Sequence, residues 1–479
     1  MSKDLLQLMS LHSSITNQHP IFLSFYGDDF TGSTDVMEAL ALNGIPTALF
    51  LAPPSPEEIK EFRLKNTVSG PERKLAAVGV AGISRSLSPK EMDDYLPPIF
   101  KQLSQIDSAF FHYKICSTFD SSPQVGSIGH ATNLAYPFFP SDYIPLLVGA
   151  PSLNRFCVFG NLFARVDGVT YRLDRHPTMA RHPVTPMHES DLRQHLAEQT
   201  DRPVQLMDLF ALETDKTTQQ AKLKELIERS GDYLLFDTYN EEHLLAVGRI
   251  LWNNRAKRRQ LLVGASGTEY AICNYLQQQK LLEKPSSPSS PGKAEPIIIM
   301  AGSCSPTTGQ QLKWIIQQGF ADIRIQGEKL VHPDERSDEM QRVEKLTLEA
   351  LSKKQPVAMY TALGPDDPSI AATNQRKQTL GLNQTPTSAL LAGAQGKILK
   401  SLLKQISVKR VVSAGGDTSG YIAQELGIYA LETLMPIAPG VPLCTAHAHD
   451  NHFDGLQIAM KGGQNGKIDY FASIVNGAS

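Results

Sequence analysis

Short apolar runs alternate with segments of helical periodicity along most of this chain. Continuous apolar runs of this length are typical of strands that are buried on both faces of a sheet. In the first 283 residues they predict strands at 21–25, 47–51, 75–80, 109–114, 143–148, 233–237 and 260–263. Helical patterns, such as those at 89–103 and 190–198, lie between several of them. This alternation predicts an α/β fold with a mostly parallel sheet covered by helices.

A stretch rich in proline and serine, residues 283–296, interrupts this pattern. Such a composition cannot form a core and is typical of a semi-extended linker. The sequence beyond it predicts a helix at 310–318 and strands at 297–301, 322–326, 356–361 and 410–413. We therefore divide the chain into an N-terminal arm (1–19), a first domain (20–283), a linker (284–295) and a second domain (296–479). Each domain is expected to be a three-layer α/β structure with a mostly parallel sheet, and ligands are expected in a cleft between the two domains.

Three carboxylates cluster where the first predicted strand ends. Asp28 and Asp29 follow the apolar run, and Asp35 comes as the next helical pattern begins. Open α/β sheets bind their ligands at the carboxyl ends of the strands. A helix N-terminus also favours acids, and Asp29 or Thr31 could serve as its cap. One acid would satisfy that cap, so three of them together favour a ligand site.

The overall composition narrows the class of protein. The 479 residues are 41% hydrophobic and 20% charged, with a formal net charge of -3. This balance is typical of a soluble globular protein and argues against nucleic-acid or anionic-membrane partners. The sequence shows neither an apolar run of bilayer length nor a secretory signal. The five cysteines are far apart and form no C-x-x-C pair, so no disulfide framework or zinc ribbon is expected, and a reducing cytoplasm is the simplest compartment.

Three glycine-rich turns in the second domain point to an anion. They read G-S-C-S-P-T-T at 302–308, G-G-D-T-S-G at 415–420 and K-G-G-Q-N-G at 461–466. Small residues let the backbone approach a ligand, a helix N-terminus presents free N–H groups, and lysine adds a point charge. One such turn alone is usually just a turn, but three in one domain predict a nucleotide phosphate site, although neither a P-loop nor G-x-G-x-x-G is present. The candidate residues are Ser303, Ser305, Gly415, Gly416, Asp417, Thr418, Lys461, Gly462 and Gly463.

Two more polar stretches stand out in the first domain. One follows the strand predicted at 109–114 and contains Lys114, Ser117 and Thr118. The other, 172–186, has three arginines and two histidines within eleven positions, and its prolines are expected to hold it extended. Guanidinium groups bind carboxylate and phosphate oxygens bidentately, so this stretch is a candidate anion site. A solvated loop that pairs with nearby acids explains it equally well. The arginines are Arg172, Arg175 and Arg181.

Cys116 and a histidine cluster near the C-terminus admit other chemistry. Cysteine is more often a small buried residue than a nucleophile, and no histidine partner for Cys116 is identified. Histidines two positions apart lie on one side of a strand, so His447, His449 and His452 could bind a metal. Histidine-rich polar loops are common without a metal, and no metal ligand is assigned.

Taken together and in order, these motifs resemble those of the four-carbon acid sugar kinase family. The resemblance covers nearly the whole chain apart from the N-terminal arm and the linker. It rests on D-D-F-T-G-S-T-D (28–35), the three glycine-rich turns, and P-G-V-P (439–442). It implies an N-terminal sugar-binding domain and a C-terminal nucleotide-binding domain, in which Gly440 would also contact the nucleotide. Members of the family use ATP to phosphorylate C4 sugar acids such as threonate, erythronate and their 3-oxo forms.

The chain departs from the family pattern K-x-x-D-S-T-L-R-G-N. Lys114, Ser117 and Thr118 match it, but Cys116 stands for the aspartate and Asp120 for the arginine. That arginine would be a partner for the substrate carboxylate, which an acid should repel. The hypothesis is that Arg172, Arg175 and Arg181 supply the missing charge. The candidate substrates are threonate or erythronate, 3-oxo-tetronate, or a related oxo acid such as 3-oxo-isoapionate.

The resulting expectation is an ATP-dependent kinase of a small sugar acid. The second domain would hold ATP, with Mg²⁺ on its β- and γ-phosphates. In the first domain Asp28, Asp29, Asp35 and Thr31 would orient substrate hydroxyls, and Asp29, or else Asp28, would accept the proton. Two alternatives stay open: a metal-dependent sugar-acid hydrolase or lyase, and a non-catalytic, nucleotide-gated sugar-acid sensor. A homodimer is left open.

Overall fold

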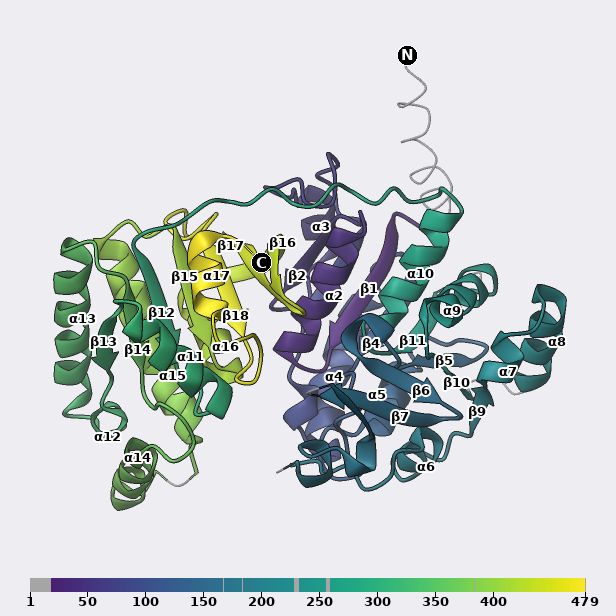
Figure 1. The fold of residues 1–479 in the computed structure, drawn as a ribbon, viewed down its shortest axis with the longest axis horizontal. Helices are drawn as coiled ribbons and strands as arrows, with labels where there is room; N and C mark the ends of the chain where they lie inside the picture. Colours follow the sequence, from purple (N-terminus) through teal and green to yellow (C-terminus); the bar gives the residue numbers. More distant parts are fainter. Residues whose placement is uncertain are drawn as a thin grey trace, which may run out of the picture. The chain divides into compact units, whose positions relative to one another are not determined.

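The computed structural model describes residues 19–478 except 167, 183, 228–231, 256–258 and 383, and leaves out the side chain of Asp417. Of the predicted N-terminal arm, residues 1–18 therefore lie outside the described residues. The chain divides into two compact units, the first ending at Ser286 and the second beginning at Ser287 (Figure 1). This boundary falls inside the segment for which the sequence predicts a linker. The predicted interdomain cleft stays a prediction.

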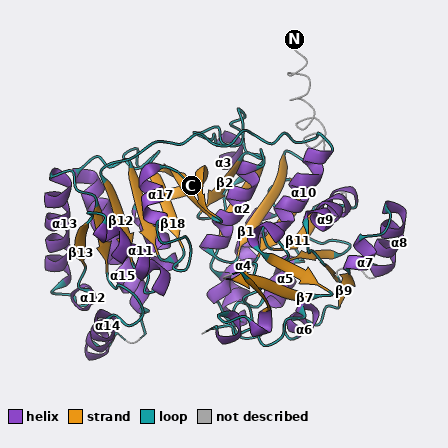
Figure 2. Cartoon of the chain, in the orientation of Figure 1, coloured by secondary structure: helices purple, strands orange, loops and turns teal. Residues whose placement is uncertain are grey.

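In the first unit a parallel sheet forms the centre (Figure 2). Its strands lie in the order β2-β3-β1-β4-β11-β5-β10-β9, and every neighbouring pair is parallel. The α/β class with a mostly parallel sheet is thus confirmed. The strands are β1 (Ile21–Gly27), β2 (Thr47–Phe50), β3 (Ala77–Ala81), β4 (Ser108–Lys114), β5 (Ile144–Leu147), β9 (Val204–Met207), β10 (Tyr233–Phe236) and β11 (Gln260–Gly264).

Helices cover both faces of this sheet. Phe110 of β4 packs on Trp252 of α9, whereas the next residue, Phe111, contacts Phe100 of α4. Since successive strand residues face opposite sides, α9 and α4 lie on opposite faces. The helices are α2 (Phe30–Leu42), α3 (Pro56–Glu61), α4 (Pro89–Leu103), α5 (Ile128–Ala135), α6 (Leu192–Ala197), α7 (Leu209–Leu212), α8 (Lys216–Leu226), α9 (Glu241–Asn253) and α10 (Gly267–Gln278). Short 3₁₀ turns are η1 (Ser84–Ser86), η2 (Pro151–Leu153), η3 (Leu173–Arg175) and η4 (Met179–Arg181).

A small antiparallel sheet of the first unit was not predicted from the sequence. It consists of β6 (Arg155–Val158), β7 (Asn161–Val166) and β8 (Val169–Arg172). Its strands are only partly buried, so they lack the continuous apolar runs that reveal the central strands. The stretch 172–186 is also less extended than predicted. It folds into η3 and η4 because the ring Nδ1 of His176 accepts hydrogen bonds from the amides of Thr178 and Met179.

The second unit contains a mixed sheet. Parallel strands lie in the order β13-β14-β12-β15-β18, and β17 and then β16 follow β18 as antiparallel neighbours. The sequence did not predict the β16–β17 hairpin, whose turn contains Gly440 at a φ of +73°. The strands are β12 (Ile297–Ala301), β13 (Ala321–Arg324), β14 (Val357–Tyr360), β15 (Arg410–Ala414), β16 (Ile428–Ala438), β17 (Val441–Ala448) and β18 (Gln457–Lys461).

This sheet also lies between two layers of helices. Ala358 and Tyr360 of β14 belong to one core with residues of α11 and α17. Between them, Met359 accepts a hydrogen bond from Thr347 of α13, which therefore covers the other face. The helices are α11 (Pro306–Gln317), α12 (Gly327–Leu330), α13 (Arg336–Ser352), α14 (Pro368–Thr379), α15 (Thr387–Gln405), α16 (Gly416–Glu425) and α17 (Tyr470–Asn476).

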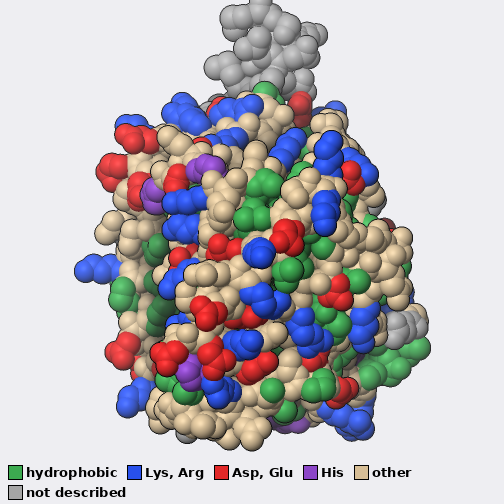
Figure 3. Space-filling view, turned by 90° about the vertical axis from the view of Figure 1, so that its left-hand side faces the viewer, with side chains coloured by type: hydrophobic (Ala, Val, Ile, Leu, Met, Phe, Trp, Pro, Cys, Tyr) green, Lys and Arg blue, Asp and Glu red, His purple; other side chains and the backbone are tan. Residues whose placement is uncertain are grey.

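The surface agrees with the balanced composition. On the face drawn in Figure 3, basic and acidic side chains are interspersed. Among the described helices, none combines the length and the apolar character needed to cross a bilayer.

Candidate functional site

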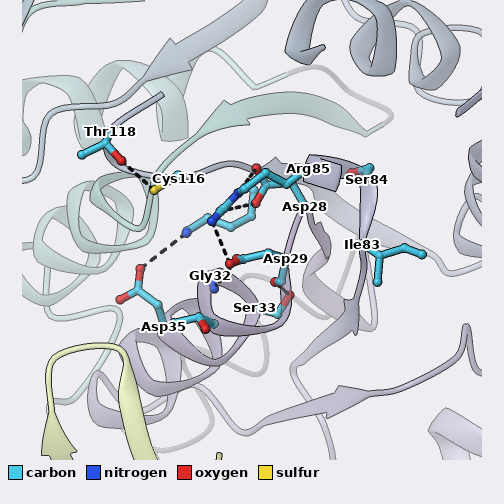
Figure 4. Close-up of polar contacts among 12 residues, drawn as sticks. Asp28, Asp29, Gly32, Ser33, Asp35, Ile83, Ser84, Arg85, Cys116 and Thr118 are labelled. Carbon is cyan, nitrogen blue, oxygen red and sulfur yellow. Dashed lines mark hydrogen bonds and ion pairs between the residues drawn. The ribbon is translucent and has the colours of Figure 1, made fainter. Parts of the chain in front are cut away.

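Polar residues of the first unit meet at the carboxyl edge of its central sheet. Strands β3, β1 and β4 are neighbours, so the residues that follow them lie together (Figure 4). Asp28 and Asp29 follow β1, Arg85 lies in η1 after β3, and Lys114 ends β4. This is the edge at which open α/β sheets bind ligands.

Asp29 does cap α2, as the alternative interpretation of the acids proposed. Its Oδ1 accepts a hydrogen bond of 2.6 Å from the amide of Gly32. Asp28 and Asp35 have no part in this cap, and both side chains are largely buried at the same edge. Capping therefore explains one acid of the three.

Arg85 is a site residue that the sequence did not reveal. Its Nε and Nη2 donate to the two carboxylate oxygens of Asp28, at 3.2 and 2.7 Å, and its Nη1 donates to Asp29 Oδ2 at 2.7 Å. Burial lowers the pKa of Arg85, but the two carboxylates outweigh burial and raise it well above its usual value. Arg85 is therefore a permanent cation. A lone arginine between two serines carries no motif, so only its position after β3 could have indicated it.

Lys114 and Asp35 form a second ionic contact at this edge. Their Nζ and Oδ2 atoms lie 3.5 Å apart, and both side chains are largely buried. Beyond Lys114, the Cys116 sulfur lies 2.9 Å from Thr118 Oγ1, and Ser117 is half-buried. Burial, reinforced by the charge of Asp120, raises the pKa of the Cys116 thiol to about 11, so a thiolate nucleophile is disfavoured.

The three arginines predicted to bind an anion lie along β8, η3 and η4. Arg172 donates to both carboxylate oxygens of Asp174. Its side chain is 46% exposed, that of Arg175 is 75% exposed, and Arg181 is exposed as well. Within the described residues no hydrogen bond or ion pair joins them to Asp28, Asp29 or Asp35. Thr31 is half-buried in the first turn of α2.

In the second unit the structure brings the three glycine-rich turns together. Strands β12, β15 and β18 are neighbours, and each turn follows one of them. The amides of Gly302 and Ser303 donate to Ala414 O, and the amide of Gly415 donates to Lys461 O. The hydroxyls of Ser305 and Thr308 both donate to Gly463 O.

The backbone of these turns is packed so closely that side chains are excluded. A Cβ on Gly302 would lie 2.1 Å from Thr418 Oγ1, and one on Gly463 would lie 2.5 Å from Ser303 Oγ. Gly415 has a φ of +126°, which side chains disfavour. The N-terminus of α16 has no side-chain cap, so its free amides can receive an anion. This arrangement fits a phosphate chain.

Lys461 lies beneath these turns. Its Nζ donates to Thr308 Oγ1 at 2.8 Å and to Gly463 O at 3.3 Å. The side chain is 1% exposed, and burial lowers the pKa of Lys461 to about 7. A phosphate nearby would restore its charge.

The other predicted nucleotide contacts are placed as follows. Gly416 begins α16, Gly462 follows Lys461, and Gly440 lies in the turn between β16 and β17. The side chain of Asp417 lies outside what the structure describes. A residue missed by the sequence is Gln395 of α15, whose buried Oε1 has no hydrogen-bond partner in the described part of the chain and faces Gly302.

The histidines near the C-terminus are dispersed. His447 is part of β17, the ring of His449 stacks on Tyr429, and Nε2 of His452 lies 2.6 Å from Leu403 O. Among the residues with described positions, no three or more His, Cys, Asp or Glu side chains are grouped to hold a metal ion.

Both units match known protein families. The model of a sugar-binding N-terminal domain matches residues 23–272, and that of a nucleotide-binding C-terminal domain matches residues 298–471. A 3-oxo-isoapionate kinase of Paraburkholderia graminis is 40% identical over 461 residues, which are 95% of this chain and 94% of that protein. A 3-oxo-tetronate kinase of Pectobacterium atrosepticum is 28% identical and covers 94% of this chain and 98% of its own length.

Solved structures show the same fold. A crystal structure from Salmonella typhimurium LT2 has a TM-score of 0.72 and 23% identity, covering 94% of this chain and 98% of its own. A Haemophilus influenzae structure, with the same coverage, has a TM-score of 0.68 and 24% identity. The two matched domains and the 40% identical kinase show that this chain belongs to the four-carbon acid sugar kinase family.

Proposed function

We propose that this protein is an ATP-dependent kinase that phosphorylates a hydroxyl of a small sugar acid. The first candidate substrate is 3-oxo-isoapionate, and the second is 3-oxo-tetronate. The observation that carries the proposal is the 40% identity with a 3-oxo-isoapionate kinase across nearly the full length of both chains. The geometry of the two units supports it, since one gathers acids and cations that suit a polyol and the other gathers turns that suit phosphates.

The second unit would bind ATP. Amides at the start of α16 and the hydroxyl of Ser303 would contact the phosphates, with Lys461 as their counter-charge. Ser305, whose hydroxyl donates to Gly463 O, would hold the turn after β18 beside them. When Mg²⁺ is bound with ATP, it would supply positive charge that neutralises the charge developing on the phosphates. Oxygen ligands suit this ion, and Thr418, beside Gly302 and Gly415, is the candidate on the protein.

The first unit would bind the acid and take up the proton. Arg85 fixes both Asp28 and Asp29, which keeps the two carboxylates oriented toward a substrate hydroxyl. The Asp29 side chain is 28% exposed and that of Asp28 is 3% exposed, so Asp29 is the more accessible base. The substrate-binding residues predicted from the sequence stay proposals: Asp35, Thr31, Lys114, Ser117, Thr118, Arg172, Arg175 and Arg181.

A coupled assay of ADP release over C4 to C6 oxo and aldonic acids tests this function. We expect turnover with 3-oxo-isoapionate or 3-oxo-tetronate, and we expect Asp29→Asn to lower kcat by roughly 100-fold or more. Asp93→Asn, an exposed acid of α4 whose described contact is His130 and not a site residue, serves as the matched control with unchanged kcat. ATP binding without turnover of any acid would contradict the kinase and favour the sensor.

A further inference from the structure

Arg155 is the first residue of β6, and one edge of its guanidinium group has no hydrogen-bond partner among the described residues. Its Nη1 is fixed, because it donates to the carbonyl oxygens of Leu153 and Asn154 at 3.2 Å each. Its Nε is buried, yet it makes no hydrogen bond within the described part of the chain. The side edge that contains Nε therefore has a donor without a protein partner in the described part of the chain.

Three other arginines of the same unit show how this edge can bind a carboxylate. In each of these three arginines, Nε and Nη2 donate hydrogen bonds to the two oxygens of one carboxylate. The pairs are Arg85 with Asp28, Arg172 with Asp174, and Arg193 with Asp191. Arg155 has the same edge without a carboxylate from the described residues.

A hydrogen-bond acceptor without a partner lies near this donor, which also has no partner. Oδ1 of Asp120 is buried and has no hydrogen-bond partner among the described residues. Arg155 forms a β-bridge with Ala150, just beyond the end of β5, and the strand order β5-β11-β4 places it at the same sheet edge as Asp120, which follows β4. No ion pair joins Arg155 and Asp120 in the described structure. Because β1 is the other neighbour of β4, this is also the edge at which Asp28 and Asp29 lie. Burial lowers the pKa of Arg155, and the Asp120 carboxylate acts in the opposite direction.

His176 adds a neutral donor to this neighbourhood. Its Nδ1 accepts from the amides of Thr178 and Met179, so the ring proton must be on Nε2. Burial and the charge of Arg155 lower the pKa of His176, which keeps the ring neutral at pH 7. The His176 ring contacts Tyr171, which lies across the small sheet from Arg155 in the row Arg155–Ala164–Tyr171. An anion next to Arg155 would therefore find the Nε2–H donor of His176 on that side.

We propose that Arg155 binds the carboxylate of the acid substrate through its Nε–Nη2 edge, while Asp120 accepts a hydrogen bond from a substrate hydroxyl close to that carboxylate. The proposal rests on the proposed function and deepens it. A buried donor and a buried acceptor are unfavourable when unpaired, and a hydroxy acid satisfies both at once. Arg172 and Arg175 are less suited, since both are more exposed and lie next to Asp174.

Arg155→Met and Arg155→Lys variants of the full-length protein test the proposal. Binding of 3-oxo-isoapionate without ATP is measured by calorimetry, and KM and kcat are measured with ATP. A neutral analogue, with a hydroxymethyl group in place of the carboxylate, is measured alongside. Arg165→Met is the matched control, because Arg165 is exposed on the neighbouring strand β7. Thermal unfolding confirms that each variant is folded.

We expect Arg155→Met to weaken binding of the acid and raise its KM by roughly 100-fold, with little change for the neutral analogue. Arg155→Lys should keep part of the affinity, because lysine retains the positive charge but cannot donate two parallel hydrogen bonds to a carboxylate. Arg165→Met should match the wild type. Asp120→Ala should raise the KM of the hydroxy acid by about tenfold. An unchanged KM, or an equal rise for the neutral analogue, would overturn the proposal.

The outcomes separate this subsite from the kinase function. If the wild type turns over the acid and Arg155→Met does so equally well, the subsite is wrong and the kinase stands. If the wild type binds the acid through Arg155 but does not transfer phosphate, the subsite stands and the kinase is wrong. If the wild type binds none of the acids, the subsite is overturned together with the proposed substrate class.

Discussion

Arg85 is a partly buried cation and Lys461 a fully buried one, and their surroundings differ. Arg85 has two carboxylates as partners, which keep it charged at any pH in the physiological range. Lys461 has a hydroxyl and a carbonyl oxygen as partners, and burial brings its pKa down to about 7. Near neutral pH a large share of Lys461 is therefore uncharged in the free protein, and its charged form depends on an incoming anion.

This difference predicts a pH dependence of ATP binding. Phosphates favour the charged form of Lys461, so above pH 7 binding must include uptake of a proton. The affinity for ATP should then fall as pH rises from about 7.5 to 9, by up to about tenfold per unit. Calorimetry in buffers of different ionisation enthalpy measures this uptake directly.

Two variants of Lys461 provide the comparison. Lys461→Met should bind ATP more weakly and without proton uptake in this range, and Lys461→Arg, which stays charged, should also lose the pH dependence. A wild-type affinity that does not change between pH 7.5 and 9 would show that Lys461 does not face the phosphates.

Contacts between residues that are far apart along the chain could not be predicted from the sequence. Arg85 contacts an acid 57 positions away, and Gln395 faces a glycine more than ninety positions away, and neither belongs to a motif. The acids Asp28 and Asp29 could be predicted, because a strand followed by carboxylates has a local pattern. Local patterns thus found the residues that follow strands, but not the partners that fix them.

The same division holds for whole elements. The helix predicted at 89–103 is α4 to the residue, and the strand predicted at 297–301 is β12. Both are signalled locally, by a serine cap or by a continuous apolar run. The hairpin β16–β17 and the small sheet β6–β8 were missed. Their burial depends on elements that lie far away in the sequence, so periodicity alone does not mark them.

A substitution in the turn after β18 tests whether this turn shapes the proposed phosphate site. A Cβ on Gly463 would lie 2.5 Å from Ser303 Oγ and 3.0 Å from Ser305 Cβ. Gly463→Ala should therefore push the turn after β18 away from the start of α11 and weaken ATP binding by more than about tenfold. Calorimetry measures the affinity and thermal unfolding measures the stability.

Gly393 in α15 is the matched control for this substitution. A Cβ there meets no atom within 4 Å. Gly393→Ala should leave ATP affinity unchanged and stabilise the fold by about 0.5–1 kcal/mol, since alanine is the better helix former. Equal ATP affinity in both variants would mean that the turn after β18 does not shape the nucleotide site.

At the scale of the whole chain, each unit is assigned one ligand. Hydrogen–deuterium exchange with each ligand alone can check this assignment. ATP should protect the turns at 302–308, 415–418 and 461–463, because ligand contacts slow local opening. The acid should protect 28–35, 83–86 and 114–120 in the first unit. Protection of the first unit by ATP, without protection of the three turns, would contradict the assignment.

The order of the motifs along the whole chain predicted the family, and the two domain matches confirm this prediction. The departure at positions 116 and 120 showed that the usual arginine is replaced, but not where a cation would come from. Arg155 begins a strand that periodicity did not reveal, and backbone carbonyls occupy its Nη1 while its Nε has no described partner. Such an arrangement becomes visible only in three dimensions.

The unpaired Nε of Arg155 and the unpaired oxygen of Asp120 have a consequence for handedness. With the carboxylates that Arg85 contacts, they provide three separate groups at one sheet edge. In the proposed binding mode these groups receive the substrate carboxylate, a neighbouring hydroxyl and the hydroxyl to be phosphorylated. A mirror-image substrate that meets two of these groups misplaces its third group. We therefore expect the proposed site to distinguish enantiomers of a sugar acid before any phosphate is transferred.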